Sequence, residues 1–506
     1  MLQKILISIF TLLGIFVLSA TASTKPLASS KPNIIFVLTD DQGMGDLSCM
    51  GNDLLKTPHL DEFHVQSTRF TDYHVSPTCS PTRAALMSGC RPFDVGVSHT
   101  VLQRERMSLD VVTLPQALKS AGYNTGLFGK WHLGDSPEYL PQNRGFDEVL
   151  MHGSGGIGQY DWGDFEANVH NRYFDNVLLH NDTVVQTKGY CTDVFFHAAL
   201  AWIKQQLEAG ETFFAYIPLN APHGPMIAPE SYKKRFLDQG FNDDTAARYG
   251  MIENIDDNIG LMMQKLEAWN ALENTLIIFM TDNGGSNKPL VWQDGAEKPM
   301  FNAGMRGGKG SPFEGGTHVP SFWYWKGVLN EGTDISCLTA HIDVYPTLCE
   351  LAGAALPEGS LKPNGRSLVP LLFDPNADWP DRKLFIHKGR WGQGRGSQAT
   401  REESQYCGGV VRTSRWRWVA ELHDGQPVFW LSDISVDPGD TTNVIDQYPD
   451  VAQQLKESFD AWWESTEPYL VNEGLMNIPP AQQPFQVMYK KQFEEMGIPE
   501  WKPADI

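Results

Sequence analysis

The chain has 506 residues, of which 41% are hydrophobic and 20% are charged. This is the composition of a globular protein long enough for more than one domain. The formal net charge of -21 argues against binding to nucleic acid or to an anionic membrane surface. An anionic ligand must therefore be held by a local group of basic side chains.

The N-terminus has the pattern of a secretory signal peptide. Lys4 precedes an apolar run over 5–17, and Ala20-Thr21-Ala22 supplies small residues for cleavage. The run is short for a membrane span, so an uncleaved anchor is the weaker alternative. No other stretch approaches transmembrane length. We therefore predict a signal peptide over 1–22 and an exported protein, periplasmic or secreted, without a membrane partner.

Four runs of strand length and mostly apolar character are each followed by polar residues. They are 33–39, before Asp40 and Asp41; 122–128, the weakest, before Lys130 and His132; 213–217, before His223; and 275–281, before Asp282 and Asn283. A strand that is apolar at every position is typical of a parallel sheet covered on both faces. Open α/β sheets bind ligands at the carboxyl ends of such strands. These polar residues are therefore candidates for one site.

The alternation of strands and helices predicts the fold class. Helical spacing of apolar residues occurs over 114–121, 194–208 and 246–269. We predict a doubly wound α/β fold: a large mixed, mostly parallel sheet sandwiched by helices, in a catalytic domain over 32–375.

Beyond residue 375 the pattern changes to short strands. The segments 384–386, 409–413, 416–419 and 428–431 alternate with turns, and a helix is expected over 451–465. This predicts a smaller α+β subdomain over 380–506 that contains a short antiparallel sheet. Its last part, 479–506, is interrupted by prolines and is expected on the surface.

Cys79 lies where proline-rich chain gives way to helix formers, with Pro81 in the expected first turn. A side chain at this position faces unpaired backbone N–H groups and the positive end of the helix dipole, which suits an anion. The chain has seven cysteines, an odd number for an exported protein, so one thiol is expected to have a separate role.

The polar residues after the strands predict a metal and an oxyanion. Asp40, Asp41, Asp282 and Asn283 offer only oxygen ligands, which favours Ca²⁺, with Mg²⁺ as the alternative, over zinc. Such a cation neutralises and polarises a bound oxyanion. Lys130, His132, His223 and Lys309 add cationic or proton-transferring groups. Together they predict hydrolysis of a sulfate or phosphate ester.

Several motifs carry a resemblance to a known family. They are Thr39-Asp40-Asp41-Gln42-Gly43, Cys79-Ser80-Pro81-Thr82-Arg83, Gly129-Lys130-Trp131-His132, Ala221-Pro222-His223, Thr281-Asp282-Asn283-Gly284 and Arg306-Gly307-Gly308-Lys309-Gly310. With these motifs in this order, the chain resembles the type I sulfatases of the alkaline-phosphatase-like superfamily. One departure is Cys90, which separates Gly89 from Arg91 where the family pattern has Gly-Arg.

The resemblance implies a role for each motif residue. Cys79 would be converted to formylglycine (3-oxoalanine) by a formylglycine-generating enzyme or an equivalent, and its hydrated aldehyde would attack sulfur. The implied metal ligands are Asp40, Asp41, Cys79, Asp282 and Asn283. Arg83 would hold the hydrated aldehyde, and Lys130 and Lys309 would bind sulfate oxygens. His223, with Lys309, would bind substrate and protonate the leaving alcohol, and His132 would take a proton from the second hydroxyl.

The substrate implied by the resemblance is a sulfated carbohydrate, either a polysaccharide or an oligosaccharide. We expect its binding surface among Trp162, Trp391, Trp416, Trp418, Arg390, Arg395 and Arg401, with burial of the tryptophans in the core as the alternative. The segment 153–176, with His152, His170 and Arg172, is a second candidate wall. Two other functions stay open: a phosphatase or phosphonate monoester hydrolase on the same scaffold, and a non-catalytic sulfated-glycan-binding protein with Cys79 unmodified.

Overall fold

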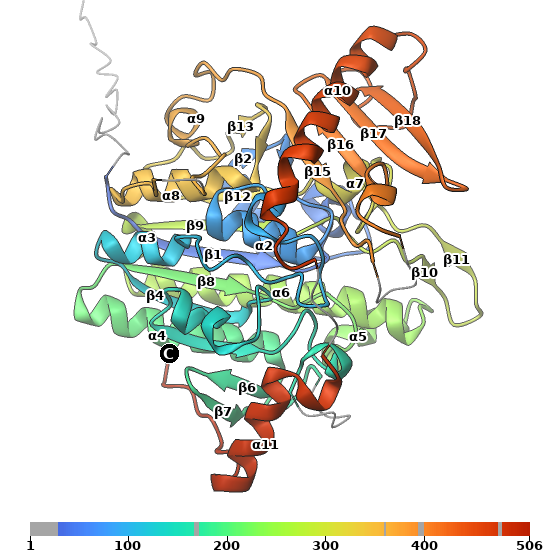
Figure 1. Ribbon diagram of the computed structural model, residues 1–506. Helices are drawn as coiled ribbons and strands as arrows, with labels where there is room; N and C mark the ends of the chain where they lie inside the picture. Colours follow the sequence, from blue (N-terminus) through green and yellow to red (C-terminus); the bar gives the residue numbers. More distant parts are fainter. Residues whose placement is uncertain (1–28, 166–171, 359–360, 393–398, 474–477) are drawn as a thin grey trace, which may run out of the picture.

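A ten-stranded mixed sheet forms the centre of the computed structural model (Figure 1). The structure describes residues 29–165, 172–358, 361–392, 399–473 and 478–506, so the expected signal peptide lies outside the described residues. The strand order is β13-β2-β12-β9-β1-β8-β4-β5-β6-β7. Five of the nine strand pairs are parallel, among them every pair from β9 to β5. The fold class is therefore the mixed, mostly parallel α/β sheet that the sequence predicts.

The strand bounds of this sheet are β1 Asn33–Thr39, β2 Thr68–Phe70, β4 Asn124–Lys130, β5 Glu148–His152, β6 Val177–His180, β7 Thr183–Gln186, β8 Phe213–Pro218, β9 Thr275–Thr281, β12 Ser321–Tyr324 and β13 Asp334–Ile335. The central strands are buried on both faces. In β1, Phe36 and Leu38 pack into one hydrophobic cluster, whereas Ile35 and Val37 pack into another on the opposite face. This explains why β1 is apolar at successive positions.

Helices cover the two faces. Figure 1 shows α4 and α6 on one side and α2, α3 and α8 on the other. The helix bounds are α1 Pro58–Gln66, α2 Cys79–Ser88, α3 Leu114–Ser120, α4 Cys191–Ala209, α5 Glu230–Leu237, α6 Asp243–Ala268, α7 Glu314–Thr317, α8 Val344–Ala352, α9 Val369–Phe373, α10 Pro449–Thr466 and α11 Pro484–Met496. The three helices predicted over 114–121, 194–208 and 246–269 are thus present with small differences at their ends.

The C-terminal part forms a separate four-stranded antiparallel sheet, as the sequence predicts. Its strands are β15 Leu384–His387, β16 Gly409–Arg412, β17 Trp416–His423 and β18 Gln426–Asp433. Helix α10 packs on it through Phe459, Trp462 and Trp463, and Figure 1 shows the helix beside this sheet. The described residues also form two small two-stranded sheets. One pairs β3 Tyr73–His74 with β14 Thr339–Ala340, and the other pairs β10 Leu290–Val291 with β11 Glu297–Lys298.

Two local expectations are corrected. Lys130 is the last residue of β4, which starts at Asn124, and Cys79 is the first residue of α2 rather than the residue before it. The proline-interrupted terminal stretch lies mostly on the surface, as expected, and contains the helix α11, which packs into the main core through Phe485. In the described part of the chain, no helix combines the length and the apolar character needed to cross a membrane.

Candidate active site

The candidate residues meet at the carboxyl ends of four adjacent strands. Asp40 and Asp41 follow β1, Asp282 and Asn283 follow β9, Lys130 ends β4, and the loop with His223 follows β8. The N-terminal turn of α2 brings Cys79 to the same place, and a loop before α7 brings Lys309. The structure therefore brings these predicted residues together at one edge of the sheet.

Buried carboxylates lie at the centre. A ligand atom from each of Asp40, Cys79 and Asp282 lies within 4.8 Å of the other two. Burial and the neighbouring Asp40 raise the pKa of Asp282 well above its usual value. Among the described residues, Asp40 Oδ1 and Asn283 Oδ1 are buried without a hydrogen-bond partner. Unpaired buried oxygens beside repelling carboxylates fit a hard cation that is bound through oxygen.

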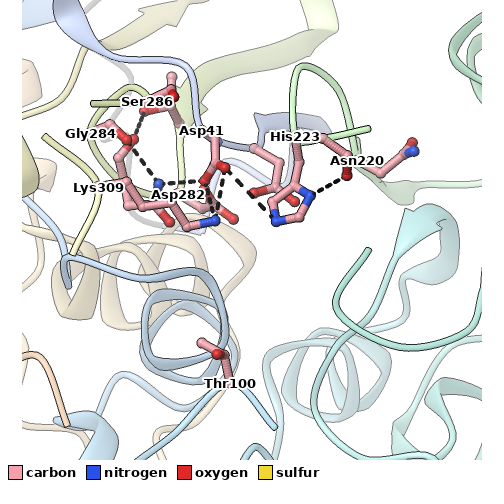
Figure 2. A network of polar contacts seen from close by, with 12 residues as sticks. Asp41, Thr100, Asn220, His223, Asp282, Gly284, Ser286 and Lys309 are labelled. Carbon is pink, nitrogen blue, oxygen red and sulfur yellow. Dashed lines mark hydrogen bonds and ion pairs between the residues drawn. The ribbon is translucent and has the colours of Figure 1, made fainter. Parts of the chain in front are cut away.

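Asp41 connects this cluster to two cationic side chains. Its carboxylate oxygens lie 2.7 Å and 2.8 Å from Lys309 Nζ, and Oδ2 lies 3.9 Å from His223 Nε2. Figure 2 shows Lys309 and His223 reaching Asp41 from opposite sides. Burial acts to raise the Asp41 pKa, but Lys309 and His223 outweigh it and keep this pKa below its usual value. Asn283 Nδ2 also donates to Asp41 Oδ1, at 2.9 Å.

Asp41 also has an unusual backbone conformation. Its φ of 65° lies in the left-handed region, which costs free energy for a residue other than glycine. Arg248 donates to the Asp41 carbonyl at 3.1 Å and to Asp46 at 2.6 Å, and so supports this turn from α6. No sequence motif indicates this contribution of Arg248.

Cys79 is buried with 3% of its surface exposed. Burial raises the pKa of its thiol, but Lys130 and Lys309 outweigh burial and lower it below the usual value. One helical turn later, Arg83 donates through Nε and Nη2 to Asp282 Oδ2, at 3.0 Å and 2.8 Å. Arg83 Nη1 also donates to the Lys130 carbonyl, at 2.9 Å. Arg83 therefore joins α2, β9 and β4 from a fully buried position.

Lys130 Nζ donates to Asp40 Oδ2 at 2.5 Å and is fully buried. His132, two residues later, has its Nε2 at 2.8 Å from the Thr100 carbonyl. Burial, assisted by Lys130, lowers the His132 pKa well below its usual value, so the ring is neutral. A neutral ring that donates from Nε2 has a free lone pair on Nδ1, which has no partner among the described residues. His132 is therefore in the tautomer that can accept a proton at Nδ1.

His223 is oriented by its neighbours. Its Nδ1 lies 2.8 Å from the Gly224 carbonyl, an acceptor, which turns Nε2 towards Asp41. The hydroxyl of Tyr173, a residue that the sequence motifs do not include, lies 2.9 Å from the Asn220 carbonyl and 2.5 Å from the His223 carbonyl, and its single proton is shared between these two acceptors. Asn220 lies beyond His223 in Figure 2. The hydroxyl of Tyr173 thus fixes the loop that carries the histidine.

The four-stranded sheet supports the loop that carries Lys309. Arg417 of β17 donates to the Pro312 carbonyl at 3.0 Å and to Glu314 Oε1 at 2.8 Å. Arg412 of β16 donates to the same Glu314 oxygen at 3.2 Å. Both arginines and Glu314 are almost fully buried. Sequence reasoning missed this contact because the partners lie about a hundred positions apart.

Two of the four tryptophans predicted for a substrate-binding surface lie in the core instead. Trp391 and Trp418 are 3% and 1% exposed and belong to the core between α10 and the four-stranded sheet. Trp416 packs against the same cluster. Arg401 lies over the ring of Trp463, 4.5 Å from its centroid, and is held in the subdomain. These tryptophans are buried because α10 packs against the four-stranded sheet, and no local sequence pattern predicts this packing.

The remaining substrate candidates lie in several places. Trp162 lines a small cavity of about 20 Å³ beside His132. Arg390 donates to the Thr100 hydroxyl at 3.2 Å. His152 is fully buried, and Arg172 is exposed. His170 and Arg395 lie outside the described residues.

The fold and the site together define an α/β protein with a buried oxygen-ligand cluster next to cationic groups for an oxyanion. The comparisons with known proteins identify the family. The model of the Sulfatase family matches residues 32–354, so the chain belongs to the sulfatase family. It is an enzyme that hydrolyses sulfate esters, as the motifs predict.

Known relatives support the same conclusion. The chain is 30% identical to N-acetylgalactosamine-6-sulfatase of Canis lupus familiaris, over 74% of this chain and 72% of the relative. It is 29% identical to arylsulfatase A of Homo sapiens, over 84% of this chain and 86% of the relative. The crystal structure of Ps i-CgsB in complex with k-i-k-neocarrahexaose has a TM-score of 0.74 and 26% identity, with 92% of this chain and 99% of that chain covered.

Proposed function

We propose that this sulfatase removes sulfate from a sulfated carbohydrate, and that it uses a formylglycine formed from Cys79 and a divalent metal. The observation that carries this proposal is the position of Cys79, buried at the first residue of α2 between the Asp40–Asp282 carboxylates and two lysines. The carbohydrate is supported by the relative named N-acetylgalactosamine-6-sulfatase and by the neighbour that was crystallised with neocarrahexaose.

Five residues are proposed as metal ligands: Asp40, Asp41, Asp282, Asn283 and residue 79 in its modified form. All donors other than residue 79 are oxygens, and Cys79 Sγ stands where an oxygen of the hydrated aldehyde would lie. An irregular all-oxygen set favours Ca²⁺ over Mg²⁺. When bound, the metal would polarise the sulfate group and the formylglycine would supply the nucleophilic oxygen.

The remaining side chains would bind the sulfate group and move protons. Lys130 and Lys309 approach Asp40 and Asp41, where they would also contact sulfate oxygens. His223 Nε2 faces this space and would donate a proton to the leaving alcohol, with Lys309 beside it. His132 would accept a proton at Nδ1. Arg83 would hold residue 79 and Asp282 in place.

Maturation and organisation complete the proposal. The chain would be exported through a signal peptide over 1–22 to the periplasm or the medium, and modified by a formylglycine-generating enzyme or an equivalent. Residues 32–375 would form the catalytic domain, and 380–506 the smaller subdomain. The two separate sheets support this division.

Mass spectrometry of the Cys79 peptide tests the modification. Protein made together with a modifying enzyme is expected to carry an aldehyde at this residue and to lose all turnover in the Cys79→Ala variant. A free thiol in fully active protein would contradict the mechanism.

Rates on matched esters test the substrate. Sulfated oligosaccharides should be cleaved faster than the corresponding phosphate esters, which are the substrates of the alternative phosphatase or phosphonate monoester hydrolase. Hydrolysis of small aryl sulfates alone would refute the carbohydrate assignment.

A further inference from the structure

A second cavity of about 560 Å³ adjoins the candidate active site. It lies between the loop after β9, the small sheet β10–β11 and the segment 299–307. Its lining includes two lysines, Lys288 and Lys298, and the apolar side chains Met300, Phe301 and Met305. None of the proposed metal ligands or proton donors lines it. The cavity is therefore a separate space next to the site.

The wall of this cavity and the Lys309 loop are built together. Lys309 N donates to the Gly285 carbonyl at 2.8 Å, and Asn287 Nδ2 donates to the Lys309 carbonyl at 3.0 Å. Gly285 and Asn287 both line the cavity. Figure 2 shows Ser286, another lining residue, beside Lys309, whose side chain turns towards Asp41. The cavity and the Lys309 side chain therefore lie on neighbouring parts of the same loop structure.

The lining has the chemistry of a site for an anionic sugar. Lys288 and Lys298 are exposed, and no ion pair involves either of them in the part of the chain that the structure describes. Two carboxylates line the cavity. Asp46 is paired with Arg248 at 2.6 Å, so Glu297 is the one carboxylate there whose charge could oppose the two lysines. In a chain with a net charge of -21, an anionic ligand needs such local basic groups. They favour an anionic ligand.

The apolar side of the cavity favours a sugar ring over a free inorganic anion. Phe301 is 41% exposed and forms part of the wall with Met300 and Met305. Pockets for organic ligands combine such apolar surface with a few polar groups that fix orientation. On the same measure one water molecule needs about 10–15 Å³, and this cavity offers about 560 Å³. This is more space than a single oxyanion fills.

We propose that this cavity binds the sugar next to the one that is desulfated, and that Lys288 and Lys298 bind a second sulfate group on that sugar. The enzyme would then select multiply sulfated oligosaccharides over singly sulfated ones. This inference rests on the proposed function, because it takes the sulfate ester at Lys309 to belong to a carbohydrate.

The test compares three substrates with the double variant Lys288→Gln/Lys298→Gln. The substrates are a disulfated oligosaccharide, the same oligosaccharide without the second sulfate, and a small aryl sulfate. We expect KM for the disulfated substrate to rise about tenfold, the effect of losing about 1.4 kcal/mol of binding, with kcat within about twofold. KM for the other two substrates should not change. Lys502→Gln, which removes an exposed lysine far along the chain, is the charge-matched control.

Phe301→Ala separates the sugar contact from the charge contact. It should raise KM for both oligosaccharides by several-fold and leave the aryl sulfate unaffected. Wild-type protein that hydrolyses the aryl sulfate but has the same KM for both oligosaccharides would overturn the second sulfate site while the sulfatase mechanism stands. The same is true if the double variant changes all three substrates alike. Failure of the wild type to cleave any oligosaccharide would instead overturn the proposed carbohydrate function, and this inference with it.

Discussion

Gly155→Ala is expected to impair catalysis through the position of His132. A Cβ at residue 155 would lie 2.5 Å from both Cε1 and Nε2 of the His132 ring, whereas ordinary contacts begin at 3.4 Å. Gly155 does not have a left-handed φ, so alanine fits its backbone and only the contact changes. Restoring normal contact requires a displacement of about 1 Å between the ring and residue 155, and we expect this to disturb the 2.8 Å hydrogen bond of the ring to the Thr100 carbonyl.

A displacement of about 1 Å in a catalytic group costs on the order of 10²-fold in rate, or about 2.7 kcal/mol of transition-state stabilisation. We therefore expect kcat of Gly155→Ala to fall about 10²-fold on an aryl sulfate, with KM changed less than about threefold. Ser154→Ala is the matched control in the same loop, because it removes one hydrogen bond to the Gly156 carbonyl and adds no atom near the ring. A kcat for Gly155→Ala equal to that of Ser154→Ala, at an unchanged melting temperature, would refute the role given to His132.

Three further predictions concern the leaving group, the metal and acid stability. His223→Gln should lower kcat/KM by about 10²-fold or more for an alkyl or sugar sulfate but only slightly for a nitrophenyl sulfate, since a good leaving group needs no proton; equal losses on both would contradict the assignment. Chelation should lower both activity and melting temperature, because Asp40 and Asp282 then repel each other, and Ca²⁺ should restore both; a chelator without effect on either would argue against the metal site. Burial lowers the His387 pKa to about 3. Since the unfolded chain binds this proton below pH 6.5 and the folded chain does not, His387 reduces stability by about 1.4 kcal/mol per pH unit from pH 6.5 towards 3. His387→Gln should flatten the acid side of the melting-temperature profile, and an unchanged slope would exclude this cause.

Local patterns in the sequence predicted the parts of the fold that depend on local burial. The strands β1 and β9 are buried on both faces, and such strands show an uninterrupted apolar run. The placement of the polar residues that follow them could be predicted because parallel strands bring their carboxyl ends to one edge. The short strands β2 and β13, at one end of the sheet, could not be predicted in the same way, since a run of two or three residues carries no period.

The contacts that support the site could not be predicted from the sequence, for a different reason. The acceptor for His132 is the backbone carbonyl of residue 100, and a carbonyl has no side-chain signature. Arg417 and Glu314 meet only after the four-stranded sheet has packed against the Lys309 loop. The burial of Trp418 depends on another packing step, that of α10 against the four-stranded sheet. Tertiary contacts of this kind decide whether an arginine or a tryptophan serves a ligand or the core.

The balance of charge in the site favours a sulfate group that is gaining negative charge. Its carboxylates and its cationic side chains are equal in number and cancel formally when all are ionised: Asp40, Asp41 and Asp282 against Arg83, Lys130 and Lys309. The proposed divalent cation then leaves two positive charges, whereas a sulfate ester carries one negative charge and the released sulfate dianion carries two. With that cation bound, the site would be matched to the more negative species, and it would bind most strongly when negative charge develops on the oxygen of the bond that breaks. These charged groups are fixed in place before the reaction, so they need not reorganise when the charge develops. Binding the transition state more strongly than the substrate is what lowers the barrier. Lys309 is one of these fixed groups. Burial acts to lower the pKa of Lys309, but Asp41 outweighs burial and keeps this pKa raised, so the lysine stays positively charged.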